Sequence, residues 1–425
     1  MALSDLIDHS PGRRSFLKGL AAGTAASLAF HPVLAACPGP RLSMKSATGT
    51  EGECPQSVIK DGMVYRRLGR TGLLISEISL GGSPLPDERL FFRLIERGIN
   101  YIDASESYEN GNVERLIGRA FKTFGRDKLH VHTRFHLRKS FTEAGIIASA
   151  EASLRRLDTD HVEVLGIHGV EDPAHLTDER VQAAFEKLKA QGKCLFRGLT
   201  SHSNQHGVIP KAVECGLYDM VQIGYNVFDI LETEKDVRTY GDYLGESGIR
   251  KLIDLAHGKD VGVIAMKVLK VGGRRQDLAA RKDGGAALFQ AMLKWALENV
   301  KLASVVTEIL NESQMEQDLA VVGRPLTSGD RRTLYAHVAA HARETCHFCG
   351  LCQAACPRSI RTADLSRSLV YFDSYEKAER ARAQVRETLA AGAVSACEDC
   401  GACERACPYG LSVRERTRRA ASLFA

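Results

Sequence analysis

Eight of the chain's twelve cysteines lie in two short clusters near its C-terminal end. The clusters read CHFCGLCQAACP (residues 346–357) and CEDCGACERACP (residues 397–408), and both have the spacing C-x2-C-x2-C-x3-C-P. Thiolates at this spacing are metal ligands, because three of them can contact one face of a metal centre. Zinc sites more often contain separated C-x2-C pairs, so the triplets favour iron–sulfur chemistry. The regular spacing is also an argument against disulfides, although a weaker one.

The two cysteine motifs resemble the ligand motifs of bacterial ferredoxins, which hold two [4Fe-4S] clusters. In those ferredoxins the first three cysteines of a motif bind one iron–sulfur cluster, and the fourth cysteine binds the other iron–sulfur cluster. This resemblance implies two interleaved ligand sets. They are Cys346, Cys349, Cys352 and Cys407 for one cluster, and Cys397, Cys400, Cys403 and Cys356 for the other. The intervening stretch YEKAERARAQVRETLAAG favours helix, and it predicts a ferredoxin-like domain of the α-helical type over residues 340–412.

A second group of residues that could do chemistry lies at the ends of apolar runs in the middle of the chain. Asp103 and Tyr108 follow the run NYIDAS, Arg134 ends KLHVHTRF, and His168 ends HVEVLGIHG. A tyrosine can donate a proton to a carbonyl oxygen when a nearby cation eases loss of that proton and a carboxylate fixes the cation. A histidine can orient the same oxygen. Each side chain alone has an equally good structural explanation, so the prediction of an active site rests on the set.

The elements that must position these residues are eight apolar runs that alternate with amphipathic segments over residues 62–325. This alternation predicts an α/β fold, a (β/α)8 TIM barrel, whose active site lies at the carboxyl ends of the strands. We expect the run LLISEISLGG (residues 73–82) to form the first strand. A doubly wound sheet is the alternative, and it is disfavoured because no strand is followed by G-x-G-x-x-G.

These segments resemble the aldo/keto reductase superfamily, chiefly in YIDASESYENGNVERLIGRA (residues 101–120) and LGIHGVEDP (residues 165–173). The later segments FRGLTSHS, VQIGYN, GVIAMKVL and VVTEILNESQMEQDL extend the resemblance over nearly the whole predicted barrel. It implies hydride transfer between NAD(P)H and a small-molecule carbonyl or alcohol, with Asp103, Tyr108 and His168 in catalytic roles. It also implies cofactor contacts from Thr200, Ser201, Gln222 and Gln314.

Three residues complicate the expected nicotinamide site. The superfamily's third-strand lysine is replaced by Arg134, which keeps the charge but does not lose its proton. We expect Arg134 to lower the pKa of Tyr108 and not to relay protons. Glu308 stands after the eighth strand, where basic residues usually hold the adenosine phosphate, and an acidic side chain there argues against NADPH more than against NADH. Lys267, at the end of the seventh strand, could instead hold a phosphate or carboxylate, or form a structural salt bridge.

The N-terminal residues have the features of a signal peptide over residues 1–36. Arg13 and Arg14 precede an apolar, small-residue stretch that is too short and too interrupted to span a membrane. The paired arginines resemble the twin-arginine (Tat) signal, which implies the Tat export machinery as a partner. The sequence LAAC resembles a lipobox, so Cys37 would be lipidated and the protein periplasmic or membrane-tethered; cleavage after Ala36 and a cytoplasmic protein are the alternatives. Residues 37–61 are expected to be a linker.

The composition excludes other kinds of partner. The net charge of +5 is mild and evenly spread, so no nucleic acid is expected. The features together predict an iron–sulfur oxidoreductase of aldo/keto reductase type that exchanges electrons with a redox partner protein or carrier through two [4Fe-4S] clusters. The alternative is an exported electron-transfer or partner-binding protein whose barrel no longer uses a nicotinamide. Arg134 and Glu308 favour this alternative, whereas the catalytic set opposes it.

Overall fold

The computed structural model describes ten ranges, all within the compact unit Cys37–Ala425. They are residues 56–137, 140–202, 204–232, 248–269, 286–341, 346, 350–373, 378–388, 394–407 and 409–424. The predicted signal peptide, Cys37, most of the predicted linker and Cys349 lie outside the described residues.

Eight parallel strands close into a barrel. They are β4 (Ile78–Gly81), β5 (Tyr101–Asp103), β6 (His130–Phe135), β7 (Val162–Ile167), β8 (Cys194–Ser201), β9 (Met220–Gly224), β10 (Gly262–Met266) and β11 (Ser304–Thr307). Their order around the barrel is β10-β11-β4-β5-β6-β7-β8-β9. Parallel strands that are covered on both faces are nearly continuous apolar runs in a sequence, which explains why apolar runs could predict these strands. The predicted (β/α)8 barrel is confirmed.

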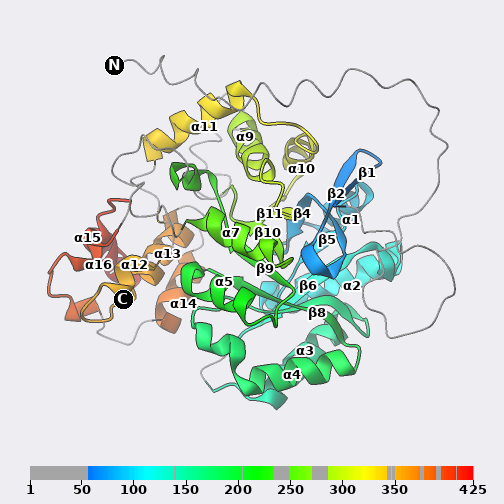
Figure 1. Cartoon of the computed structure of the whole chain (residues 1–425), viewed down its shortest axis with the longest axis horizontal. Coiled ribbons are helices and arrows are strands. Elements are labelled where there is room, and N and C mark those ends of the chain that lie inside the picture. Colours follow the sequence, from blue (N-terminus) through cyan, green and yellow to red (C-terminus); the bar gives the residue numbers. More distant parts are fainter. Residues whose placement is uncertain are drawn as a thin grey trace. The chain divides into compact units, whose positions relative to one another are not determined.

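Helices follow the strands and cover the barrel, as Figure 1 shows. They are α1 (Glu88–Glu96), α2 (Asn112–Phe124), α3 (Glu143–Leu157), α4 (Glu179–Ala190), α5 (Gln205–Glu214), α7 (Ile249–Gly258), α9 (Ala286–Leu297) and α10 (Glu312–Leu319). Side-chain caps fix several helix starts: Asp87 accepts a hydrogen bond from the backbone of Leu90, and Thr142 accepts one from Gly145. Short 3-10 turns complete the connections: η2 (Gly69–Thr71), η3 (Tyr108–Gly111), η4 (Arg126–Lys128), η5 (Pro173–Thr177), η6 (Val227–Glu232) and η7 (Val394–Ala396).

The run predicted as the first barrel strand is divided between two sheets. Its first part, β3 (Leu74–Ser76), pairs with β2 (Met63–Arg67), which pairs with β1 (Ser57–Lys60) in a small antiparallel sheet. The division falls at Glu77, a buried carboxylate bound by Arg66 at 2.8 Å. Only the second part, β4, enters the barrel, so the single-strand prediction was wrong. The strand β1 also begins inside residues 37–61, the range expected to be a linker.

The small sheet leads into a plug at the amino-terminal end of the barrel. Leu68, Leu73 and Ile75 pack against Tyr101, the first residue of β5, and Met220, the first residue of β9. The opposite, carboxyl end is therefore the end that remains available for a ligand, as in other barrels of this type.

Helices α11 (Ser328–His341), α12 (Leu351–Ala354), α13 (Thr362–Asp373), α14 (Ala378–Thr388), α15 (Ala402–Arg405) and α16 (Val413–Phe424) make up the C-terminal region. The short helices α12 and α15 both start after a glycine in the left-handed conformation, Gly350 and Gly401. Their similarity reflects the repeated cysteine motif. The predicted α-helical C-terminal domain is confirmed, and α16 extends it beyond residue 412, because Phe424 packs on Phe372 of α13.

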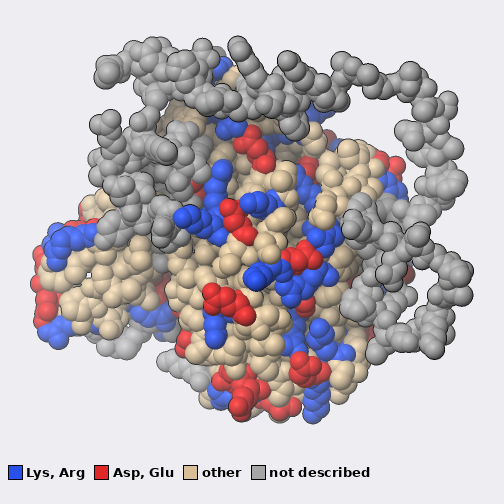
Figure 2. Space-filling view, viewed as in Figure 1, with Lys and Arg blue, Asp and Glu red and all other residues tan. Residues whose placement is uncertain are grey.

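The surface carries charges of both signs. Figure 2 shows lysine and arginine interspersed with aspartate and glutamate on the visible face. Within the described part of the chain, no helix has the length and apolarity needed to cross a membrane.

Candidate active site

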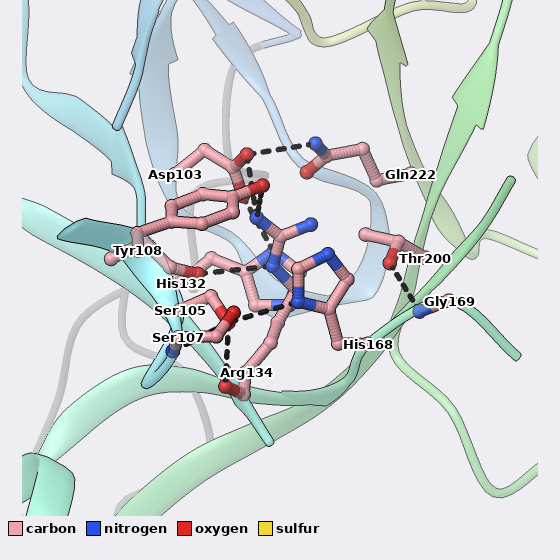
Figure 3. Close-up of polar contacts among 11 residues, drawn as sticks. Asp103, Ser105, Ser107, Tyr108, His132, Arg134, His168, Gly169, Thr200 and Gln222 are labelled. Atoms are coloured by element: carbon pink, nitrogen blue, oxygen red, sulfur yellow. Dashed lines mark hydrogen bonds and ion pairs between the residues drawn. The ribbon is translucent and has the colours of Figure 1, made fainter. Parts of the chain in front are cut away.

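A single guanidinium joins the predicted proton donor, Tyr108, to the carboxylate of Asp103 at the carboxyl end of the barrel. Arg134 on β6 donates from Nη2 to Asp103 Oδ2 at 2.8 Å and to the Tyr108 hydroxyl at 2.9 Å (Figure 3). Its Nε donates to the Ala104 carbonyl at 3.0 Å, and the side chain is only 1% exposed. The predicted arrangement of carboxylate, cation and tyrosine is therefore present in space.

The protonation of Tyr108 differs from what the sequence suggested. Burial raises the pKa of Tyr108 above its ordinary value, and Arg134 lowers it by a smaller amount. Burial likewise raises the pKa of Asp103 against the opposing effect of Arg134. Arg134 does lower the pKa of Tyr108, as expected. The pKa is nevertheless raised overall, because the effect of burial is larger. Tyr108 is protonated at neutral pH, and because Arg134 donates to its oxygen, its own O–H can donate to a ligand.

His168 lies beside Tyr108, as predicted. The two rings meet edge to face with centroids 5.5 Å apart, and Nδ1 of His168 is 2.9 Å from the Ser105 hydroxyl. Ser105 also donates to the Arg134 carbonyl at 3.2 Å, so it connects the histidine to β6. Ser105 was not predicted, although its position two residues after Asp103 was a usable signal.

A further histidine, His132, lies inside the barrel below this group. It is on β6, two residues before Arg134, and is fully buried with Nδ1 3.8 Å from Asp103 Oδ1. Gly166 and Gly198 make room for it, because a Cβ at either position would lie 2.2 Å or 2.9 Å from its Nε2. Burial, assisted by Arg134, holds the pKa of His132 well below its ordinary value. His132 is therefore a neutral spacer beneath the ion pair.

Two more histidines surround His168. The ring of His136 is centred 4.3 Å from that of His168, and the ring of His202 is 5.3 Å away. Glu106 accepts a hydrogen bond from the His136 backbone at 3.0 Å. Burial alone would raise the pKa of Glu106, but hydrogen bonds from His136 and Ser149 outweigh it and lower the pKa to about 2. The mouth of the barrel thus carries a fixed negative charge next to its histidines.

A cavity of about 960 Å³ opens beside these residues. Its wall includes Asp103, Tyr108, His168, His202, Gln222, Lys267, Glu308 and, from α13, Tyr371. Gln222 donates to Asp103 Oδ2 at 3.2 Å, while its own buried Oε1 has no hydrogen-bond partner. Lys267 has a left-handed backbone, with φ of 60°, which is a strained conformation of the kind that clusters at functional sites.

The other predicted cofactor contacts do not line this cavity. Thr200 is fully buried and accepts a hydrogen bond from the Gly169 backbone at 2.9 Å, and Ser201 donates to the Val170 carbonyl at 2.9 Å. Gln314 on α10 folds back to accept from the Leu310 backbone at 2.7 Å. The structure therefore brings Gln222 and Lys267 to the cavity and uses Thr200, Ser201 and Gln314 to hold backbone in place.

The described cysteines of the C-terminal domain lie in two groups that overlap at Cys403. Cys356, Cys397, Cys400 and Cys403 all line one cavity. Cys403 is also buried in the small core that contains Cys346 and Cys352, and Cys407 packs on that core. The described cysteines form no disulfide. Among the described residues, no three His, Cys, Asp or Glu side chains converge on a single metal ion. The donor set fits an iron–sulfur cluster.

Sequence reasoning missed two residues that shape the site. Gly82 has no room for a side chain, because a Cβ would lie 2.7 Å from both the Asp103 carbonyl and Val113 Cγ1. Tyr371 reaches the cavity from a helix more than two hundred residues away in the sequence. No local pattern could indicate this second contact.

Comparisons with known proteins agree with this geometry. Residues 88–285 match the Aldo/keto reductase family, and residues 340–412 match the 4Fe-4S dicluster domain. The aldo-keto reductase AMT2 of Alternaria alternata is 25% identical over 297 residues, which cover 59% of this chain and 76% of that protein. L-galactose dehydrogenase of Arabidopsis thaliana is 27% identical over 310 residues, which cover 63% and 91%.

Among solved structures, the aldo-keto reductase AKR11C1 of Bacillus halodurans (holo form) has a TM-score of 0.50 at 21% identity, covering 64% of this chain and 96% of that one. This likeness supports the barrel fold. The family match and the relatives indicate an oxidoreductase that is similar to the aldo/keto reductases. The chain carries an aldo/keto reductase domain, which a 4Fe-4S dicluster domain follows.

Proposed function

We propose that this protein interconverts a small carbonyl compound and its alcohol, with electrons exchanged through two [4Fe-4S] clusters. The observation that carries the proposal is the Tyr108 hydroxyl, held by Arg134 at 2.9 Å in the wall of a cavity that the cluster-type domain also lines. A protonated phenol in the wall of a cavity is a suitable proton donor to a carbonyl oxygen.

Each side chain of the group has a distinct role in this proposal. Tyr108 gives its proton to the substrate oxygen during reduction and recovers one during oxidation. Arg134 compensates the negative charge that develops on Tyr108, at a distance of 2.9 Å, and Asp103 fixes the orientation of Arg134. His168, held by Ser105, helps to orient the substrate oxygen.

Reducing a carbonyl to an alcohol takes two electrons and two protons. Each [4Fe-4S] cluster would carry one electron at a time from a redox partner, so two transfers would be needed for each carbonyl, and the second proton would come from solvent. Cys346, Cys349, Cys352 and Cys407 would hold one cluster; Cys397, Cys400, Cys403 and Cys356 would hold the other. The cavity lined by the described thiols of the second set supports this assignment.

NAD(P)H would supply the same electron pair as a hydride. The amide Gln222 and the cation Lys267, both in the cavity wall, support a nicotinamide. Glu308 in the same wall opposes a bound phosphate. The replacement Arg134 and this glutamate favour a second candidate, in which the barrel takes electrons only from the clusters and a redox partner protein.

Anaerobic titration separates the two candidates. Protein purified without oxygen should contain about eight iron atoms and show a broad visible absorption. Bleaching by NADH or NADPH would support the nicotinamide-dependent enzyme, and bleaching only by dithionite would support the second candidate. The dithionite-reduced protein should recover its absorption when an aldehyde is added. If no aldehyde or ketone restores the visible absorption of the reduced protein, the proposed carbonyl chemistry is contradicted.

We also propose that residues 1–36 direct export of the folded protein by the Tat route, with Cys37 as the lipidated first residue. Iron–sulfur clusters are inserted in the cytoplasm, so a protein that carries them must cross the membrane already folded. The order of Arg13 and Arg14, apolar stretch and LAAC supports this proposal.

A further inference from the structure

Helix α13 of the cluster-type domain reaches the catalytic cavity. Tyr371, near its C-terminal end, lines the same cavity as Tyr108. The two phenols are close enough that Tyr371 raises the pKa of Tyr108 electrostatically. The cavity wall also includes the apolar side chains of Pro84, Leu269 and Val306 among its polar residues. A carbonyl compound bound at Tyr108 whose substituent extends to α13 would meet the ring of Tyr371.

A group of charged residues fixes α13 to the barrel. Glu171, in the loop after β7, accepts from Arg367 at 3.2 Å and pairs with Arg361. Asp364 pairs with both arginines, and it is 2% exposed while Arg367 is 6% exposed. Asp364 lies on the same helical segment as the two arginines and holds them in place. The pairs from Arg361 and Arg367 to Glu171, whose side chain is 34% exposed, are the ones that join α13 to the barrel.

The barrel side of this contact continues to the catalytic histidine. Asn204 donates from Nδ2 to the Glu171 carbonyl at 2.8 Å. Gly169 and Val170, which join Glu171 to His168, are held by Thr200 and Ser201 through the bonds described above. This explains the burial of these two hydroxyls. The loop that carries His168 is thus braced from β8 on one side and from α13 on the other.

We propose that α13 completes the substrate site, and that Tyr371 sets the size of the apolar group that a carbonyl substrate may carry. This inference rests on the proposed function and narrows its substrate class to carbonyl compounds with a compact apolar substituent. Glu171, through Arg361 and Arg367, is the positioning residue that keeps α13 in place.

Two variants of Tyr371 test the specificity part. The assay mixes dithionite-reduced protein with benzaldehyde or with para-alkyl benzaldehydes of increasing length and follows the return of visible absorption. With Tyr371→Ala, kcat/KM for the longest aldehyde should rise about 10-fold relative to benzaldehyde, because the lost ring leaves space for several methylenes. Tyr371→Phe, which keeps the ring, should follow the native protein. An unchanged length profile in Tyr371→Ala would overturn the assignment.

Hydrogen exchange tests the positioning part without any substrate. In Glu171→Gln, peptides covering residues 168–172 and 361–371 should exchange faster together. Glu316→Gln, which removes the exposed pair with Arg97, should leave both peptides unchanged. Native exchange in Glu171→Gln would overturn the positioning role. If the native protein reduces no aldehyde at all, the proposed function fails, whereas this exchange result still decides whether α13 is held by Glu171.

Discussion

Arg134 does at the residue scale what a lysine could not do in the same way. Its planar group gives one nitrogen to both Asp103 and Tyr108 and another to the Ala104 carbonyl. A lysine ammonium also has three donors, but all of them are on one nitrogen at the end of a flexible chain, so it has no second nitrogen in a fixed plane for the Ala104 carbonyl. The arginine therefore holds the tyrosine rigidly, and it remains a cation throughout the reaction.

The role of Tyr108 predicts a specific loss. Tyr108→Phe keeps the ring but removes the proton donor, so the rate of carbonyl reduction should fall by about 10²- to 10⁴-fold. Substrate affinity should change little, because the cavity keeps its shape. The measurement is single-turnover reoxidation of reduced protein by an aldehyde, at several aldehyde concentrations. Native rates in the variant would show that another group delivers the proton.

His132 predicts a pH dependence of stability. Because its pKa in the folded protein lies well below 6.5, the unfolded chain binds a proton that the folded chain excludes once the pH falls below about 6.5. This contribution to stability is complete above that pH and is lost below it, by up to about 1.4 kcal/mol per pH unit.

The matching experiment compares thermal unfolding at pH 7.5 and pH 5.5. The midpoint of native protein should drop on acidification, and the drop should be smaller in His132→Gln. Some of the drop should remain in the variant, because burial also lowers the pKa of His130 and His130 is unchanged there. An equal drop in both proteins would show that His132 is not held neutral.

The residues of the site could be predicted where they end strands. Asp103, Arg134 and His168 were found because a barrel brings successive strand ends to one mouth. The net effect on Tyr108 could not be predicted, because burial is a property of the assembled cavity. Gly82 was missed for the same reason. Only a glycine fits there because Asp103 and Val113 lie too close for a Cβ atom, and only the fold brings these two residues near.

At the scale of elements, α13 joins two kinds of chemistry. Its first residue, Thr362, donates from Oγ1 to Cys352 Sγ at 3.2 Å, and Tyr371 lies about 13 Å further along the helix axis. One helix, α13, therefore contacts a predicted cluster ligand, carries the arginine that pairs with Glu171, and contributes Tyr371 to the cavity wall. The sequence predicted a helix in this region of the domain but not its contact with the barrel, since that contact joins Glu171 to residues far along the chain.

The hydrogen bond from Thr362 predicts a change in reduction potential. It stabilises the more negative, reduced state of a cluster bound by Cys352, so Thr362→Val should lower that cluster's potential. A bond worth about 1 kcal/mol corresponds to roughly 40 mV for one electron. An EPR-monitored redox titration measures the shift. Thr333→Val, on α11 and away from the cysteines, is the matched control, and an equal shift there would contradict the assignment.

At the scale of the whole molecule, the leader and the clusters make one prediction together. Replacing Arg13 and Arg14 by lysine should leave the precursor in the cytoplasm with its iron content intact, because the change affects recognition by the export machinery and not folding. Cell fractionation followed by iron analysis of each fraction measures this. Lys18→Arg keeps the charge and the arginine pair, so it should be exported normally; a twin-lysine precursor that still leaves the cytoplasm would contradict the Tat assignment.

The plug at the amino-terminal end of the barrel has a consequence for orientation. The described chain enters through β1 and β2, and the residues that follow them pack against the strand starts, on the face away from Tyr108. A group attached directly ahead of Ser57 would therefore join the molecule on its closed face and leave the cavity at the carboxyl end open to a diffusing substrate.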